Sequence, residues 1–150
     1  MSNLETQRTY ALVGTGGCGK TSLAEMLLFQ AGVINRLGAI EEGTTSLDYE
    51  PEETRRRGSI QPGFATFEWN RNRHYLVDVP GDSNFSGDME YLLQAVDAAV
   101  LSHAHYDHGN GMEAFFRRND HAPFYVGPTC AADCSWVKSF NSLYFFNRHS

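Results

Sequence analysis

Residues 14–21 read Gly-Thr-Gly-Gly-Cys-Gly-Lys-Thr and match the pattern G-x-x-x-x-G-K-[ST]. An apolar segment at residues 8–13 precedes this stretch, and a segment with helical spacing of apolar residues follows it. Between a strand and a helix, the glycines let consecutive backbone N–H groups surround a phosphate, and the helix start favours the anion. The stretch therefore predicts a phosphate-binding loop. The alternative is a glycine-rich turn that binds nothing, which G-K-[ST] after a strand disfavours.

The side chains of this loop have predictable roles. Lys20 supplies positive charge to the terminal phosphates, and the hydroxyl of Thr21 can ligate Mg²⁺. Cys18 is interpreted as a small filler residue at a variable position. The predicted nucleotide-binding residues of the loop are Gly14, Thr15, Gly16, Gly17, Cys18, Gly19, Lys20, Thr21 and Ser22.

Strand and helix patterns alternate outward from the loop. Strands are expected at residues 8–13, 64–69, 74–77, 98–101 and 124–126, and helices at residues 20–31, 88–96 and 112–118. In the first helix the apolar residues at helical spacing are Leu23, Met26, Leu27 and Ala31. Residues 32–58, which include the charged run EPEETRRR, are predicted to form a mobile loop. The alternation indicates an α/β fold.

A second motif, Asp78-Val-Pro-Gly81, ends the third expected strand. In P-loop GTPases an aspartate at this place holds Mg²⁺ through water, and the glycine N–H contacts the terminal phosphate. Alone, D-x-P-G would be a common turn. Together with the phosphate loop, it predicts that Asp78 and Gly81 belong to the same nucleotide site.

Residues 7 to about 101 resemble the N-terminal GTPase domain of translation elongation factor G. The resemblance rests on the phosphate loop and on the stretches EEGTTSLDYEPEETRRRGSI, FATFEW and DVPGDSNFSGDMEYLLQAVDAAV. It implies binding of GTP or GDP with Mg²⁺, for which Ser59 would be a ligand beside Thr21. It also implies the ribosome as a partner. Arg55, Arg56 and Arg57 would then contact a phosphate or ribosomal RNA, although solvated charges balanced by nearby glutamates are the favoured interpretation.

The sequence departs from that family in ways that bear on activity. Asp82 stands where the family has the histidine that positions the attacking water, which predicts weak or absent hydrolysis. Gly17 replaces a usual aspartate, and the guanine-reading motif N-K-x-D is absent from the sequence. Guanine specificity is therefore implied by the resemblance alone, and enzymatic activity stays undecided.

A second group of chemically active residues lies in Ser102-His-Ala-His-Tyr-Asp-His108. His103 and His105 can point toward one Zn²⁺ ion, and Asp107 and His108 can serve a second. This H-x-H-x-D-H pattern resembles the metallo-β-lactamase superfamily, and the likeness runs from about residue 98 to 150. It implies a metal-dependent hydrolase as the alternative function, although the further ligands of that family are missing. The alternative, a polar loop whose histidines are merely solvated, is disfavoured by this density of ligand residues.

The two resemblances meet inside the strand expected at residues 98–101. We therefore expect a composite: a partial P-loop GTPase sheet over residues 1–101, joined to a partial metallo-β-lactamase-like αβ segment over residues 102–150. A natural fusion, an artificial recombinant or an erroneous gene join would each produce it, and such a composite could be inactive. The other interpretation is an intact small P-loop protein that has acquired metal ligands.

Composition restricts the partners. The 150 residues are 41% hydrophobic and 20% charged, which suits one compact domain, and the net charge of −6 argues against a general basic surface for DNA. No apolar run is long enough to cross a bilayer, and the start lacks the features of a secretory signal. Three cysteines, Cys18, Cys130 and Cys134, suit reduced thiols. The sequence predicts a cytoplasmic protein without a membrane partner.

Overall fold

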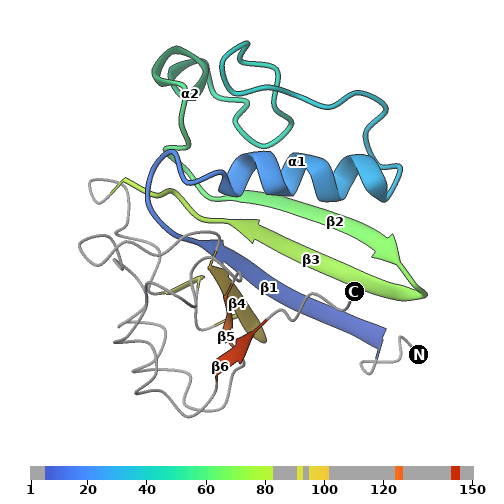
Figure 1. Ribbon diagram of the computed structural model, residues 1–150. Helices are drawn as coiled ribbons and strands as arrows, with labels where there is room; N and C mark the ends of the chain where they lie inside the picture. Colours follow the sequence, from blue (N-terminus) through green and yellow to red (C-terminus); the bar gives the residue numbers. More distant parts are fainter. Residues whose placement is uncertain (1–5, 83–90, 93–94, 102–123, 127–142, 146–150) are drawn as a thin grey trace.

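The computed structural model describes residues 6–82, 91–92, 95–101, 124–126 and 143–145. In this part of the chain, the strands form one mixed sheet in the order β2-β3-β1-β4-β5-β6 (Figure 1). The strands are β1 (Gln7–Val13), β2 (Gly63–Trp69), β3 (Asn72–Asp78), β4 (Ala98–Leu101), β5 (Phe124–Val126) and β6 (Leu143–Phe145). The helices are α1 (Lys20–Gln30) and α2 (Pro51–Arg56).

The pairing of the strands places the ends of β1 and β3 together. β1 lies between β3 and β4 and is parallel to both, with Leu12 opposite Asp78 and Val13 opposite Leu101. β2 pairs antiparallel with β3 through a tight turn in which Asn70 and Arg71 have positive φ. Because parallel strands end at the same edge of a sheet, the loops that follow β1 and β3 meet there.

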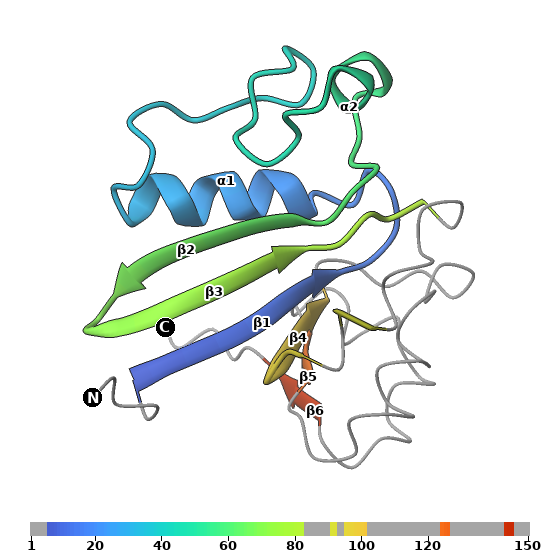
Figure 2. The ribbon, with the colours of Figure 1, turned by 180° about the vertical axis from the view of Figure 1, so that it is seen from behind.

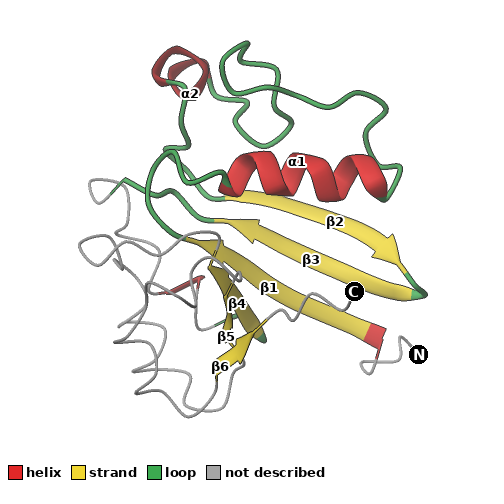
Figure 3. Cartoon of the chain, viewed as in Figure 1, coloured by secondary structure: helices red, strands yellow, loops and turns green. Residues whose placement is uncertain are grey.

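Helix α1 packs on one face of the sheet against β3 and β1. The loop with α2 lies on the side of this helix that faces away from the sheet (Figures 1 to 3). Ala24 and Leu28 are buried in a core cluster that includes Leu12 of β1 and Leu76 of β3. The helix predicted at residues 20–31 is confirmed at residues 20–30. Leu23, Leu27 and Ala31 are only partly buried against the core, and Met26 is 51% exposed. The orientation of α1 after the glycine loop turns the helix face with Ala24 and Leu28 toward the core, whereas Met26 lies on an exposed face.

The segment predicted as a mobile loop, residues 32–58, contains the short helix α2. Pro51 occupies its first turn, where the missing N–H removes nothing, and the Glu53 carboxylate accepts the Glu50 N–H at 3.1 Å. Arg55 and Arg56 lie in the last turn, where positive charge suits the helix dipole. The charges that suggested a solvated loop are therefore arranged as a helix requires, and the loop prediction was wrong for these residues.

The later part of the described chain continues the same sheet. The strands predicted at residues 98–101 and 124–126 are confirmed with these bounds, and β6 was not predicted. Parallel pairing of β4 with β5 and of β5 with β6 extends the sheet beyond residue 101. Of the helix expected at residues 88–96, four residues are described: Tyr91 and Leu92 are helical, whereas Ala95 and Val96 are not. The helix expected at residues 112–118 lies outside the described residues.

Candidate functional site

The loop between β1 and α1 has the backbone conformation that its glycines allow. Gly14, Gly17 and Gly19 have φ values of 141°, 75° and 86°, a region that side chains with a Cβ rarely enter. Gly19 directly precedes α1, so the free N–H groups of the first helical turn face the loop. The sequence pattern predicted this turn because its glycines are needed where the chain reverses.

Lys20 lies beneath the loop and is held by its backbone. The side chain is only 5% exposed, and Nζ donates hydrogen bonds to the carbonyl oxygens of Gly14 at 3.0 Å and Thr15 at 2.7 Å. The sulfur of Cys18 lies 3.6 Å from the same nitrogen. The positive charge is therefore fixed inside the curve of the loop, where phosphate oxygens would meet it.

Gly81 brings the end of β3 against the phosphate loop. Its carbonyl oxygen accepts the Gly16 N–H at 3.1 Å. A Cβ at position 81 would lie 2.3 Å from the nitrogen of Gly16 and 2.6 Å from Nζ of Lys20. Only glycine permits this approach, which joins the D-x-P-G turn to the phosphate loop.

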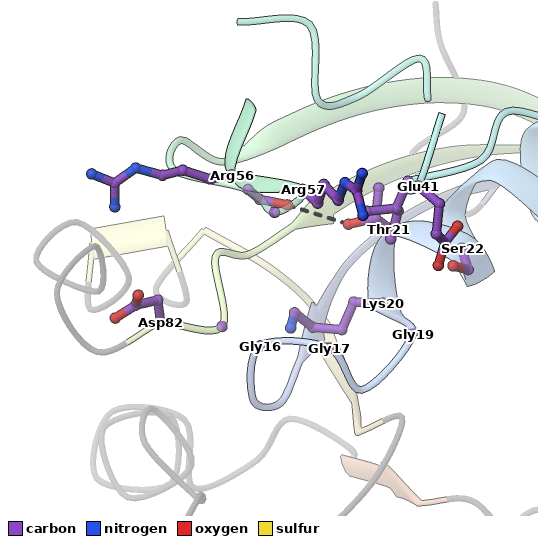
Figure 4. A pocket seen from close by; sticks show the side chains of 14 residues that line it. Gly16, Gly17, Gly19, Lys20, Thr21, Ser22, Glu41, Arg56, Arg57 and Asp82 are labelled. Carbon is purple, nitrogen blue, oxygen red and sulfur yellow. Dashed lines mark hydrogen bonds between the residues drawn. The ribbon is translucent and has the colours of Figure 1, made fainter. Parts of the chain in front are cut away.

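These loops enclose a cavity of about 710 Å³ (Figure 4), within the size range of small-molecule sites. One wall is the phosphate loop and the start of α1, another is the loop after it together with the end of α2, and the third is the turn after β3. The lining residues are Gly16, Gly17, Gly19, Lys20, Thr21, Ser22, Ile40, Glu41, Arg56, Arg57, Gly58, Ser59, Gly81 and Asp82.

Three predicted site residues meet beside this cavity. Thr21 Oγ1 donates a hydrogen bond of 2.6 Å to Oδ2 of Asp78 and lies 3.2 Å from the hydroxyl of Ser59. Ser59 Oγ in turn donates to Oδ1 of Asp48 at 2.7 Å. Sequence reasoning did not find Asp48, because it belongs to the segment interpreted as a mobile loop.

This group of oxygens suits a hard cation. Asp78 Oδ1 and Asp48 Oδ2 are buried, and neither has a hydrogen-bond partner in the described part of the chain. Carboxylate and hydroxyl oxygens are the donors that Mg²⁺ prefers, directly or through water. The residues present therefore fit a magnesium ion, with Thr21 and Ser59 as the hydroxyl donors.

The electrostatics of the two aspartates agree with such a site. Burial raises the pKa of Asp78 to about 6, against the hydrogen bond from Thr21 and the charge of Lys20, which lower it. Burial also raises the pKa of Asp48, although the hydrogen bond from Ser59 opposes this shift. The nearby carboxylate of Glu53 raises both pKa values further. A cation placed among these groups would favour their ionised forms.

Two other buried carboxylates hold the loop that covers the site. Glu25 of α1 accepts the backbone N–H groups of Gly38, at 3.0 Å, and of Ser46. Glu53 accepts those of Ile60 at 2.9 Å and Gln61 at 3.0 Å. Sequence reasoning missed both residues. For Glu25 the helical spacing was a signal, because Glu25 lies between Thr21 and Leu28 on the buried face of α1.

The three consecutive arginines occupy different places. Arg56 and Arg57 line the cavity, and Arg55 does not. Arg55 and Arg56 both lie beside Glu52, at 3.4 Å and 2.9 Å. The favoured interpretation, solvated charges balanced by glutamates, therefore fits Arg55 and Arg56. Contact of Arg57 with a phosphate or ribosomal RNA stays a prediction.

The predicted zinc ligands His103, His105, Asp107 and His108 lie outside the described residues, as do Cys130 and Cys134. Within the residues that are described, no group of three histidine, cysteine, aspartate or glutamate side chains could hold a metal ion. None of the helices described there is long and apolar enough to cross a membrane.

Comparison with protein families identifies the architecture. The sequence model of the family described as the elongation factor Tu GTP binding domain matches residues 5–111. The match passes residue 101, where the composite interpretation places its join, and includes the H-x-H-x-D-H stretch. These comparisons give no support to a metallo-β-lactamase segment.

Individual proteins with similar sequences or structures include translation factors, in agreement with the family match. An elongation factor G-like protein of Mycobacterium tuberculosis is 39% identical over 94 residues, which are 63% of this chain and 13% of that protein. Ribosome-releasing factor 2, mitochondrial, of Debaryomyces hansenii is 33% identical over 93 residues, 62% of this chain and 11% of that protein. A crystal structure of a protein from Thermus thermophilus superposes with a TM-score of 0.72 at 32% identity, covering 87% of this chain and 20% of that one. The chain thus spans a small fraction of the length of the relatives it matches.

Proposed function

The chain belongs to the family of the elongation factor Tu GTP-binding domain, and on this premise we propose that it binds GTP and GDP with Mg²⁺ in the cavity described above. The observation that carries the proposal is the contact of Thr21 with both Asp78 and Ser59 beside the phosphate loop. Three segments far apart in sequence there supply oxygens for a metal next to a site for phosphates.

In this proposal different protein groups bind the phosphates and the metal ion. The backbone N–H groups of the phosphate loop and the ammonium group of Lys20 hold the phosphates. Thr21 and Ser59 hold the metal, and the carboxylate of Asp78 orients the Thr21 hydroxyl toward its place. When bound, Mg²⁺ would neutralise part of the phosphate charge. The proposal gives the Gly81 N–H the role of contacting the terminal phosphate, and the contact of Gly81 with the phosphate loop supports it.

We further propose that hydrolysis of GTP is weak or absent. Asp82 lines the cavity directly after Gly81. A carboxylate at this position repels the phosphates, and it replaces the histidine that positions water in the resembling factors. An Asp82→His variant should raise the single-turnover rate of GTP hydrolysis at least tenfold above wild type. Equal rates in the two proteins would contradict this part of the proposal.

Guanine specificity, contact with the ribosome and a cytoplasmic location are also proposals. They rest on the family, because the matched segment is only 11–13% of the length of the two curated relatives. The described residues include no N-K-x-D motif that would read the base. Competition between GDP and ADP for the same site would test the specificity directly.

The main test is a titration with a fluorescent GDP analogue in the presence and absence of Mg²⁺. Lys20→Ala should weaken binding by at least a hundredfold, since it removes the charge fixed under the phosphate loop. Arg36→Ala is the matched control, because this exposed arginine lies outside the cavity lining, and it should bind as wild type does. Failure of wild type to bind the analogue at millimolar concentration would refute the proposal.

The zinc-dependent hydrolase predicted from His103, His105, Asp107 and His108 stays a prediction from the sequence motif. No observation among the described residues favours it. The division into residues 1–101 and 102–150 and the inactive composite also stay predictions from the sequence.

A further inference from the structure

Arg57 has an unusual backbone conformation at the edge of the cavity. It ends helix α2 with φ 56° and ψ 48°, in the left-handed region that residues other than glycine seldom adopt. The next two residues, Gly58 and Ser59, also line the cavity, and the Ser59 hydroxyl belongs to the oxygen cluster. Residues in such a conformation are concentrated at functional sites, so Arg57 is a candidate for a role in this cavity.

The backbone around Arg57 is held without help from its guanidinium group. The N–H groups of Arg57 and Gly58 both donate to the carbonyl oxygen of Glu53, the latter at 3.2 Å. The carboxylate of the same glutamate accepts the N–H groups of Ile60 and Gln61. The long side chain is therefore not needed to form the turn, and it lines the cavity without a role in holding the backbone.

The neighbouring arginines provide an internal comparison. All three arginines are exposed, but Arg55 and Arg56 both form ion pairs with Glu52, at 3.4 Å and 2.9 Å. In Figure 4 the side chain of Arg56 points away from the phosphate loop, whereas Arg57 lies on the side of the cavity that holds Thr21 and Glu41. Among the described residues, no carboxylate forms an ion pair with Arg57.

We infer that Arg57 supplies a second protein cation, beside Lys20, to the phosphate chain of the bound nucleotide. The inference rests on the proposed function and adds to it a binding residue outside the phosphate loop and the D-x-P-G turn. Lys20 donates two of its three protons to backbone carbonyls, so a second cation would add hydrogen-bond donors for the remaining phosphate oxygens. A guanidinium group has several donors in a planar fork that matches phosphate geometry.

The test compares variants of equal charge in the full chain. Arg57→Asn removes the cation and keeps a residue that tolerates the left-handed conformation, and Arg57→Gly does the same without backbone strain. Arg55→Asn removes the same charge outside the cavity. We expect the dissociation constant of a fluorescent GDP analogue to rise about tenfold for both Arg57 variants and less than about twofold for Arg55→Asn. Arg57→Lys should stay within about threefold of wild type.

The outcomes separate this inference from the proposed function. If wild type does not bind the analogue, the proposed function fails. If wild type binds and both Arg57 variants match Arg55→Asn, the inference alone is overturned. It is also overturned if Arg57→Lys loses as much affinity as Arg57→Asn, because the positive charge would then not be the reason. Circular dichroism and thermal unfolding of each variant show whether the fold is kept.

Discussion

The hydroxyl of Thr21 donates a hydrogen bond of 2.6 Å to Oδ2 of Asp78, a residue 57 positions further along the chain. The parallel pairing of β1 with β3, which sets Leu12 opposite Asp78, brings the first turn of α1 against the end of β3. The other carboxylate oxygen, Oδ1, is buried without a partner in the described structure. The pair is thus arranged to hold a cation. Without a cation, the ionised carboxylate of Asp78 is buried with one oxygen unpaired, which is unfavourable.

A dependence of stability on pH should follow from this pair in the metal-free protein. Because the folded pKa of Asp78 is raised to about 6, its contribution to stability is complete below pH about 4 and is lost as the pH rises through 6. We expect the free energy of unfolding of wild type, relative to Asp78→Asn, to fall by about 3 kcal/mol between pH 4 and 7. Urea denaturation in the presence of a chelator measures this difference.

Added Mg²⁺ is the control for that prediction. It should stabilise wild type more at pH 7 than at pH 5, because ionised Asp78 favours the cation, and it should have little effect on Asp78→Asn. A difference between the two proteins that stays constant from pH 4 to 7 would show that Asp78 does not titrate in this range.

Gly81→Ala should damage both the fold and nucleotide binding. The new methyl group would lie 2.3 Å from the nitrogen of Gly16, so the turn after β3 must move away from the phosphate loop. We expect a loss of about 1–3 kcal/mol in the free energy of unfolding. Nucleotide affinity should also fall, as measured by titration at a temperature where the variant stays folded.

Gly58→Ala is the matched control, since position 58 also lines the cavity but a Cβ there meets nothing within 4 Å. Equal behaviour of the two variants would mean that the close approach at Gly81 is unimportant.

Glu25→Ala should release the loop that covers the site. The variant leaves the N–H groups of Gly38 and Ser46 without their acceptor, and each unsatisfied buried group costs about 1–3 kcal/mol. Hydrogen exchange should accelerate at these two amides, and nucleotide should dissociate faster. Glu25→Gln, which keeps one acceptor oxygen, should fall between wild type and Glu25→Ala.

Glu42→Ala removes an exposed glutamate of the same loop and should leave exchange unchanged. If it accelerated exchange as much as Glu25→Ala does, the loss of net negative charge, and not the lost acceptor, would be the cause.

The histidine-rich stretch yields a prediction from sequence alone. His103, His105, Asp107 and His108 should bind Zn²⁺ detectably, because close ligands need little extra ordering to meet an ion. Turnover of phosphodiester, thioester or lactam substrates should be negligible, since the remaining ligands of the resembling hydrolases are missing. Analysis of bound metal in a His103→Ala, His105→Ala double variant tests the first claim, with His149→Ala as control. Zinc-dependent turnover that disappears in His103→Ala would contradict the second claim, that turnover is negligible.

The local elements were readable from the sequence because short-range rules govern them. The glycines at positions 14, 17 and 19 occur where the backbone needs positive φ, and Lys20 and Thr21 follow at the spacing that starts a helix. Alternating or continuous apolar runs located β1 to β5 to within two residues. The shared site of Asp78, Gly81 and the phosphate loop was inferred from the arrangement in P-loop GTPases, and the pairing of β1 with β3 brings these residues together.

Other features depended on the tertiary structure, because they arise only when distant segments pack together. Sequence spacing does not reveal that Asp48 meets Ser59, or that Glu25 caps amides of a loop 13 and 21 residues away. It also does not separate Arg57 from Arg55, since three consecutive arginines look equivalent in the sequence although only Arg56 and Arg57 line the cavity. The sequence by itself determined the phosphate loop, helix α1 and the strands β1 to β5 through local backbone requirements. Which charged side chains are buried, and against which partners, was decided by the packing of the loop over α1.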